Sequence, residues 1–152
     1  MGRRERKKPK KGKTVALPQE GQEKFQRWTF MDWIQINGGT RNVVHEWLNS
    51  LPIEDKQAIN TRLTSMSRME RWPDTWASSY QGCPGILELR MNINDTPYRP
   101  LGCYGPPTQR WQFTILVGAI EKRGKISTIL LKQAIDRKRN LSQRCIHEHI
   151  YD

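Results

Sequence analysis

Alternating apolar and polar residues in the second half of the chain limit its fold more than any other feature. Every second residue of 87–93 is apolar and the residues between are polar or charged, which is the period of a half-buried β-strand. Residues 111–119 also alternate, but both of their faces are largely apolar, so we expect a long central strand buried on both sides. Between these two, Pro97–Tyr104 predicts a further strand whose prolines favour an edge position or a bulge.

A last helix is predicted after the central strand. Gly124 breaks that strand, and Ser127 or Thr128 can accept hydrogen bonds from the first turn of a helix. The expected inward face of this helix consists of Leu130, Leu131, Ala134 and Ile135. The stretch Ile86–Arg139 is therefore predicted to be a strand–strand–strand–helix unit.

The first half of the chain predicts a strand and two helices. Thr29–Ile36 is rich in aromatic and β-branched residues and ends at the turn Asn37–Gly39. We expect Thr40 to cap a helix that stops near Ser50. Its inward face consists of Val43, Val44, Trp47 and Leu48. A second helix starts at Pro52, and its inward face consists of Ile53, Ala58, Ile59, Leu63 and Met66.

These elements predict the fold class. Arg68–Pro84 contains several Trp, Pro and Gly residues and is expected to be an irregular packed loop. The resulting order is β-α-α-β-β-β-α, in which short turns make neighbouring strands antiparallel. We therefore expect an α+β domain, with an antiparallel sheet against which a helical hairpin and a C-terminal helix pack.

The net charge of +11 is concentrated near the N-terminus. Met1–Lys13 contains eight Lys or Arg and a single acid, Glu5. Because this segment has no apolar residue after Met1, we expect residues 1–20 to be a disordered basic tail and residues 21–152 to form the folded domain. The tail is either a phosphate-binding arm or a solubilising extension. A strongly basic chain favours polyanionic partners such as RNA and DNA.

Neither a membrane span nor an export signal is expected. No run approaches the ~18 consecutive apolar residues of a membrane-spanning helix, and Thr14–Leu17 is too short for the apolar core of a signal peptide. The three cysteines are odd in number and scattered, which fits a reducing compartment better than a disulfide framework. We therefore expect a cytoplasmic protein without membrane association.

Several blocks of sequence together carry a resemblance to a known superfamily. They are VVHEWLNSLP with the INTRL helix after it, LELR at Leu87–Arg90, PYRPLGCYGP at Pro97–Pro106, and FTILVGAIEKRGK at Phe113–Lys125 before a basic helix. In this order, across Trp28–Asn140, they resemble the RelE/ParE superfamily of toxins from type II toxin–antitoxin systems, and in particular its HigB-like, phage-derived branch.

The resemblance implies a RelE-like fold and a toxin that cuts mRNA on the translating ribosome. It also implies that the partners are mRNA, the ribosome and a cognate antitoxin of the helix-turn-helix type. Members similar to ParE inhibit DNA gyrase on the same fold without cleaving RNA, so the fold alone leaves the activity open. The alternatives are therefore a gyrase inhibitor and a DNA- or RNA-binding module that does not cleave.

Metal-independent cleavage of RNA requires the ribose 2′-hydroxyl to attack the adjacent phosphorus while the enzyme neutralises the phosphorane charge and moves protons. Arg90 projects from the polar side of its predicted strand and Arg99 lies in the next strand, so both guanidinium groups could bind one phosphate. Glu121 is the candidate base, because the cations beside it favour its ionised form. The predicted catalytic residues are therefore Arg90, Arg99 and Glu121.

Further residues are predicted to bind RNA. They are Lys122, Arg123, Lys125, Tyr98, Tyr104 and Arg137. The cations extend the positive field at the end of the central strand and along the last helix, and the tyrosines could stack on a base or act as an acid. Some members of the superfamily use a histidine in this region, whereas these blocks contain none, so binding without cleavage stays open.

Two pairs of charged residues in these strands also have a plain structural interpretation. Glu88 and Arg90, like Glu121 and Arg123, are spaced as ion pairs on a solvated strand surface, and such pairs contribute only ~0.2–1 kcal/mol each.

No metal, no cofactor and no base-stacking surface are expected. Cys145, His147 and His149 carry metal-binding atoms, but they lack a fourth partner and the spacing of a structural zinc site. The tryptophans at 33, 47 and 111 fall on predicted core faces.

Overall fold

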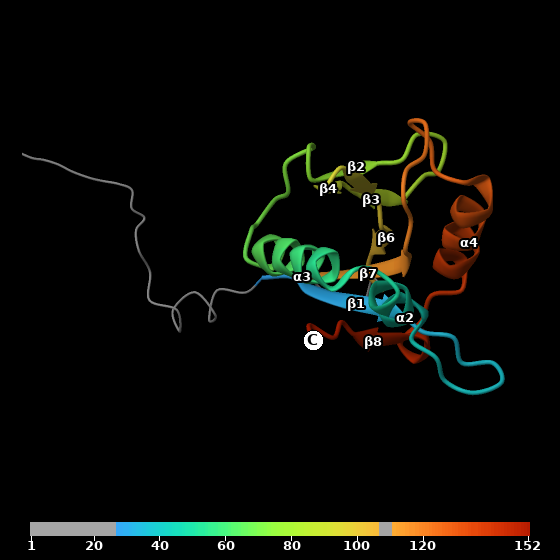
Figure 1. The fold of residues 1–152 in the computed structure, drawn as a ribbon. Helices are drawn as coiled ribbons and strands as arrows, with labels where there is room; N and C mark the ends of the chain where they lie inside the picture. The colour runs from blue at the N-terminus through green and yellow to red at the C-terminus, as the bar shows by residue number, and fades with distance from the viewer. Residues whose placement is uncertain (1–26, 107–110) are drawn as a thin grey trace, which may run out of the picture.

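The computed structural model of the chain describes residues 27–106 and 111–152 (Figure 1). The helices are α2 (Val43–Asn49), α3 (Ile53–Ser67) and α4 (Thr128–Arg139), and a short 3₁₀ turn covers Gln143–Cys145. The strands are β1 (Thr29–Trp33), β2 (Ala77–Ser79), β3 (Leu87–Leu89), β4 (Met91–Ile93), β5 (Thr96–Tyr98), β6 (Leu101–Tyr104), β7 (Gln112–Val117) and β8 (Ile146–Glu148).

The described strands form one large sheet and a separate hairpin. The large sheet has six strands in the order β2-β3-β6-β7-β1-β8, and β4 pairs with β5 alone. All pairs are antiparallel except β1 with β7, which runs parallel. The predicted α+β class with a mostly antiparallel sheet is confirmed.

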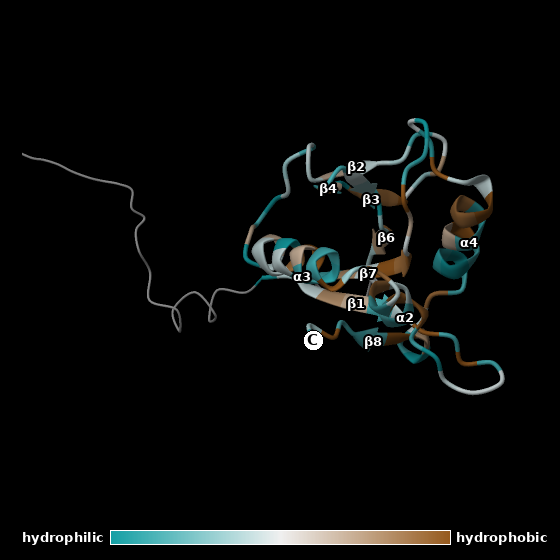
Figure 2. Cartoon of the chain, viewed as in Figure 1, coloured by the Kyte–Doolittle hydropathy of each residue, from teal (hydrophilic) through white to brown (hydrophobic). Residues whose placement is uncertain are grey.

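Strand β7 lies inside the sheet, and four of its six residues are apolar. Phe113 and Ile115 contribute to the core under α2 and α3, whereas Leu116 contributes to the core under α4. Residues 113–117 are all buried, as expected for a strand covered on both faces. Figure 2 shows the hydrophobic colour of β7 between helices of mixed character.

Helix α2 begins two residues later than predicted, because its cap is Asn42 and not Thr40. Gln35 and Arg41 exchange backbone hydrogen bonds of 2.8 and 2.9 Å around the turn at Asn37–Gly39, so the helix starts only after them. The side chain of Asn42, and not that of Thr40, accepts a hydrogen bond of 2.8 Å from the backbone of His45. The prediction that Thr40 caps the helix is therefore wrong.

Helices α3 and α4 bury most of the predicted faces. Ile59, Leu63 and Met66 of α3 are buried, whereas Ile53 is 57% exposed. Asp55, four residues before Ile59, takes the inward position instead. Helix α4 is capped by Ser127, as predicted, and its predicted inward residues are buried or half-buried.

Two predicted strands are each broken by an arginine. The strand expected over 87–93 divides at Arg90 into β3 and β4, and that expected over 97–104 divides at Arg99 and Pro100 into β5 and β6. The backbone N–H of Arg90 donates to the carbonyl of Trp76 at 2.7 Å, and the Arg90 carbonyl accepts from Arg62 at 3.0 Å. The first bond continues the register of β2 with β3, in which Ala77 lies opposite Leu89, and beyond Arg90 the chain pairs β4 with β5 instead.

Two further strands were not predicted. The loop expected over Arg68–Pro84 contains the short strand β2, which pairs with β3. Strand β8 near the C-terminus pairs with β1. Strand β1 itself ends at Trp33 rather than Ile36.

The described part of the chain says nothing about the predicted basic tail, because residues 1–20 lie outside it. None of the described helices has the length and apolar character needed to cross a membrane.

Candidate nucleic-acid interface

A tight turn between β7 and α4, Lys122–Lys125, carries three cations, and we call it the basic loop. The backbone N–H of Lys122 donates to the carbonyl of Lys125 at 2.8 Å, and that of Lys125 donates back at 3.0 Å. The central residues Arg123 and Gly124 have φ of 54° and 75°, the positive values that a two-residue hairpin turn of type I′ requires. The turn therefore holds its side chains on a closed, rigid backbone.

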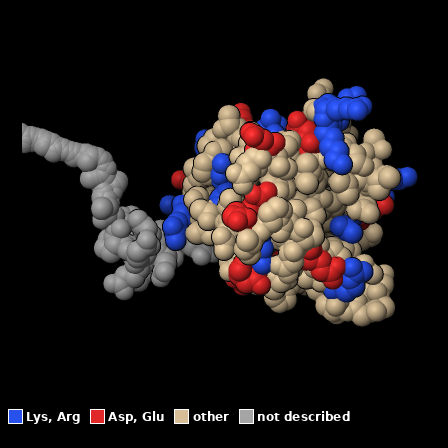
Figure 3. Space-filling model, viewed as in Figure 1, with Lys and Arg blue, Asp and Glu red and all other residues tan. Residues whose placement is uncertain are grey.

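The cations of the basic loop are exposed and unpaired. Within residues 27–106 and 111–152, no carboxylate forms an ion pair with Lys122, Arg123 or Lys125. Figure 3 shows Lys and Arg side chains gathered at the upper right, over the loop that precedes α4. Such cations can bind phosphate groups without giving up an existing partner.

Glu121, the residue just before the basic loop, belongs to a different arrangement. We call it the arginine cluster, and its members are Arg90, Arg99, Glu88, Glu121 and Asn92. Arg99 is only 3% exposed, and its guanidinium group makes three hydrogen bonds. It donates to Glu121 Oε1 at 3.1 Å, to Asn92 Oδ1 at 3.0 Å and to the carbonyl of Tyr98 at 2.9 Å. Its donors are therefore largely used within the protein.

Glu88 joins the two predicted phosphate-binding arginines. Its Oε2 accepts from Arg90 Nη1 at 3.0 Å, and its Oε1 lies 3.9 Å from Arg99 Nε. The structure thus brings Arg90 and Arg99 to the same place, but a carboxylate lies between them. A phosphate shared by both arginines would have to compete with Glu88, and for Arg99 with Glu121 as well.

The exposed fractions of these side chains separate their roles. The Arg90 side chain is 38% exposed, the Glu121 side chain 25% and the Arg99 side chain 4%. The ion pair of Glu88 with Arg90 matches one structural interpretation of the sequence, whereas Glu121 pairs with Arg99 instead of Arg123. Glu121 can present its carboxylate to solvent beside the basic loop.

The two predicted tyrosines lie in different surroundings. Tyr98 is buried, and its hydroxyl donates to Asp55 Oδ2 at 2.5 Å; burial and the carboxylate raise the pKa of Tyr98 to about 12. Tyr104 is 52% exposed, and its ring stacks near Trp72. Tyr104 pairs with Phe113 at the start of β7, the opposite end of that strand from the basic loop.

Arg137 is held against the sheet rather than turned to solvent. It donates to the carbonyl of Leu116 at 2.8 Å, and its guanidinium group lies 4.1 Å from the centre of the Trp33 ring. Burial lowers its pKa. Through these contacts, Arg137 connects helix α4 to the sheet.

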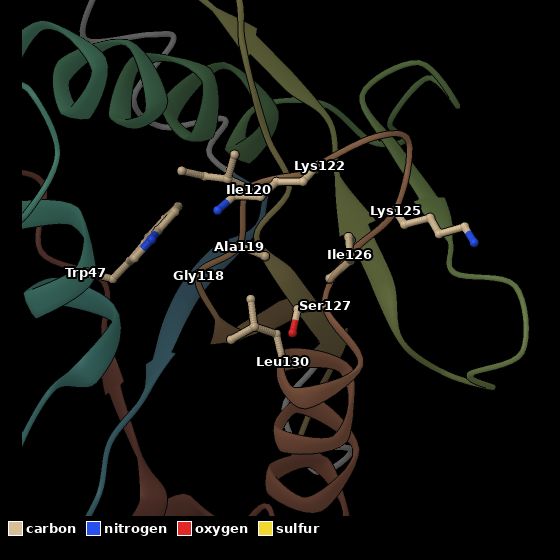
Figure 4. Close-up of a pocket in the computed structure, with 9 residues that line it drawn as sticks. All are labelled: Trp47, Gly118, Ala119, Ile120, Lys122, Lys125, Ile126, Ser127 and Leu130. Carbon is tan, nitrogen blue, oxygen red and sulfur yellow. The ribbon is translucent and has the colours of Figure 1, made fainter.

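A pocket of about 590 Å³ adjoins the basic loop, and the sequence did not indicate it (Figure 4). It is lined by Trp47, Gly118, Ala119, Ile120, Lys122, Lys125, Ile126, Ser127 and Leu130. Trp47 was expected in the core, but it is only partly buried. The one signal in the sequence was Gly118, because a glycine within a strand pattern often marks a close approach of another group.

A second arrangement that the sequence did not indicate lies under the C-terminus. His149 is buried, and its ring nitrogens lie 2.7 Å from Asp32 Oδ1 and 2.8 Å from Asn60 Oδ1. Asn42 donates to the other oxygen of Asp32 at 3.0 Å. Since no solvent reaches Asp32, this group ties the C-terminal segment to the fold.

Comparison of the chain with family models, with curated proteins and with solved structures gives no match. The candidate interface therefore depends on the geometry of the basic loop, the arginine cluster and the pocket.

Proposed function

We propose that this chain binds RNA through the basic loop, as a toxin-type protein whose target is mRNA. The observation that carries the proposal is the set of exposed, unpaired cations at Lys122, Arg123 and Lys125 on a rigid turn. Cations of this kind bind the phosphate backbone with little regard to sequence and release counterions as they do so. Arg90 is the nearest cation of the arginine cluster with appreciable exposure.

The toxin class and the choice of mRNA rest on the resemblance to the RelE/ParE superfamily. When the short strands β2, β4, β5 and β8 are set aside, the remaining order β1, α2, α3, β3, β6, β7, α4 is compatible with a RelE-like fold and supports this part of the proposal. The ribosome and a cognate antitoxin would then be the partners in the cytoplasm.

RNA binding is tested with fluorescence anisotropy of a labelled single-stranded RNA. One variant combines Lys122→Gln, Arg123→Asn and Lys125→Gln; asparagine is chosen because it tolerates a positive φ. A matched control combines Lys132→Gln, Arg139→Gln and Arg144→Gln, which removes the same charge from exposed positions elsewhere. We expect at least about ten-fold weaker binding for the loop variant alone. If RNA binding were weakened equally in both variants, net charge alone would account for the binding, and the proposal would be overturned.

A second candidate function, cleavage of the bound RNA, is favoured by the position of Glu121. Arg99 holds one of its oxygens, and its side chain is partly exposed next to Lys122. In this role Glu121 would take the proton of the 2′-hydroxyl, whose oxygen attacks the adjacent phosphorus, while Lys122 and Arg123 neutralise the phosphorane charge. The leaving 5′-oxygen would receive its proton from water or another acid.

Cleavage is tested by expressing the protein from a tightly controlled promoter and mapping mRNA ends in the arrested cells. We expect cuts that disappear with Glu121→Gln, whose amide oxygen can still accept from Arg99. Growth arrest with intact mRNA would indicate that the protein binds RNA without cleaving it. Growth arrest with altered DNA supercoiling would indicate gyrase as the target.

A further inference from the structure

The pocket beside the basic loop has the size and lining of a small-molecule site. Its volume of about 590 Å³ lies within the ~300–1,000 Å³ typical of ligand pockets. The walls are mainly apolar, from Ala119, Ile120, Ile126 and Leu130. The pocket is therefore suited to a flat apolar group that carries a charge at one end.

Trp47 is the one aromatic side chain in this lining, and two contacts fix its position. A Cβ atom on Gly118 would lie 2.0 Å from Cδ2 of the Trp47 ring, so only glycine allows the ring to lie so close to the strand backbone. The Tyr98 ring lies edge-on, with its centre 6.1 Å from that of Trp47. Trp47 thus presents a fixed indole surface to the pocket.

The charged groups are at the side of the pocket formed by the basic loop. Figure 4 shows Lys122 extending across the pocket toward Trp47, whereas Lys125 points away from it. Ser127, which caps α4, also lines the pocket, and the start of that helix adds to the positive potential. An anionic group would therefore lie near Lys122 when an aromatic group lies against Trp47.

We propose that this pocket binds one nucleobase of the RNA strand, stacked on Trp47, with the neighbouring phosphate held by Lys122. The inference rests on the proposed RNA-binding function and adds to it a place where a single base leaves the strand. Every nucleobase has a π-face, so a stacking pocket of this kind accepts different bases. Trp47, predicted on a core face, packs against the core and also lines this pocket.

Two measurements test the pocket. In the first, Trp47→Leu, Trp47→Phe and Trp33→Leu are compared with the wild type for binding of the labelled RNA, after circular dichroism has verified their folding. We expect about ten-fold weaker binding for Trp47→Leu, as for the loss of one stacked base, and near wild-type binding for the other two. In the second, adenosine 5′-monophosphate and ribose 5-phosphate are titrated into the wild-type protein, and the indole N–H signals of tryptophan are followed by NMR. The Trp47 signal is assigned with Trp47→Phe.

The outcomes separate the pocket from the proposed function. A shift of the Trp47 signal with adenosine 5′-monophosphate, larger than with ribose 5-phosphate, supports a base in the pocket even if the protein fails to bind RNA. If the basic-loop variant loses RNA binding but Trp47→Leu binds as tightly as the wild type, RNA binding stands and the pocket inference falls. An unchanged Trp47 signal with both compounds likewise overturns it.

Discussion

The arginine cluster and the basic loop meet in the chain where Glu121 precedes Lys122, yet the structure uses their charges in opposite ways. Glu121 and Lys122 are neighbours in sequence, but Glu121 is committed to Arg99, whereas Lys122 has no carboxylate partner among the described residues. In the cluster, two arginines and two glutamates balance one another. The position of a cation in a strand pattern therefore does not decide its role. A cation that is paired with a carboxylate stabilises the fold, whereas a cation without such a partner is available to a ligand.

The largest expected effect is on Arg99. Arg99→Ala would leave the buried Glu88 and the partly exposed Glu121 without their shared guanidinium, which should lower the free energy of unfolding by about 3–5 kcal/mol. Arg90→Ala removes a more exposed partner of the same Glu88 and should cost at most about 1 kcal/mol. Urea denaturation measures both. If both variants lost the same free energy of unfolding, Arg90 and Arg99 would contribute equally to stability despite their different exposure.

His149, a buried polar residue away from the basic loop, should also stabilise the fold through its partners, but with a smaller effect than Arg99. His149→Ala leaves Asp32 and Asn60 with fewer partners, and we expect a loss of about 1–3 kcal/mol in the free energy of unfolding. His147→Ala, on the same C-terminal segment but exposed, should change it by no more than about 0.5 kcal/mol. If both histidines proved equally tolerant, the segment would not be held by His149.

The basic loop should show its effect in the salt dependence of RNA binding and not in stability. The triple loop variant removes up to three phosphate contacts, so the slope of log affinity against log salt should become less steep by about 2. Its urea midpoint should stay close to that of the wild type, because these side chains form no ion pair with any residue that the structure describes. A clear loss of stability with an unchanged salt slope would mean that the cations of the basic loop stabilise the fold and do not contact phosphate.

The smallest effect is expected for Asp152, which is paired but exposed. Hydrogen bonds from Lys56 and His45 lower the pKa of its carboxyl to about 2. Because the folded pKa is below the ordinary value, this pair stabilises the fold above about pH 4, and the contribution disappears as the pH falls toward 2. Asp152→Asn should therefore lower the urea midpoint slightly near neutral pH but hardly at about pH 2. A difference that persists in acid would exclude the ion pair as its cause.

Much of the fold was predictable because the deciding signals are local. The alternation along β7 led to the buried central strand, and the serine at 127 led to the start of α4. The turn at Asn37–Gly39 was also visible in the sequence. In each case a few neighbouring residues set the backbone conformation.

The candidate site was predictable only in part. The sequence indicated that Arg90, Arg99 and Glu121 would gather, and the structure brings them together. It did not indicate that Glu88 would stand between the arginines, nor that Tyr98 would be committed to Asp55, 43 residues away in the chain. Partners so far apart in sequence leave no periodic signal.

The sequence by itself determined the central strand β7, the three described helices and the clustering of cations after β7, because periodicity, caps and turn residues act over a few positions. Only the tertiary structure decided which cations are paired, where the strands break at Arg90 and Arg99, and that Trp47 meets Gly118 beside the basic loop. These outcomes depend on which distant side chains arrive to supply a carboxylate, a carbonyl or an empty space. Charge in the sequence therefore indicated the candidate interface, and packing decided which of its residues are available to a ligand.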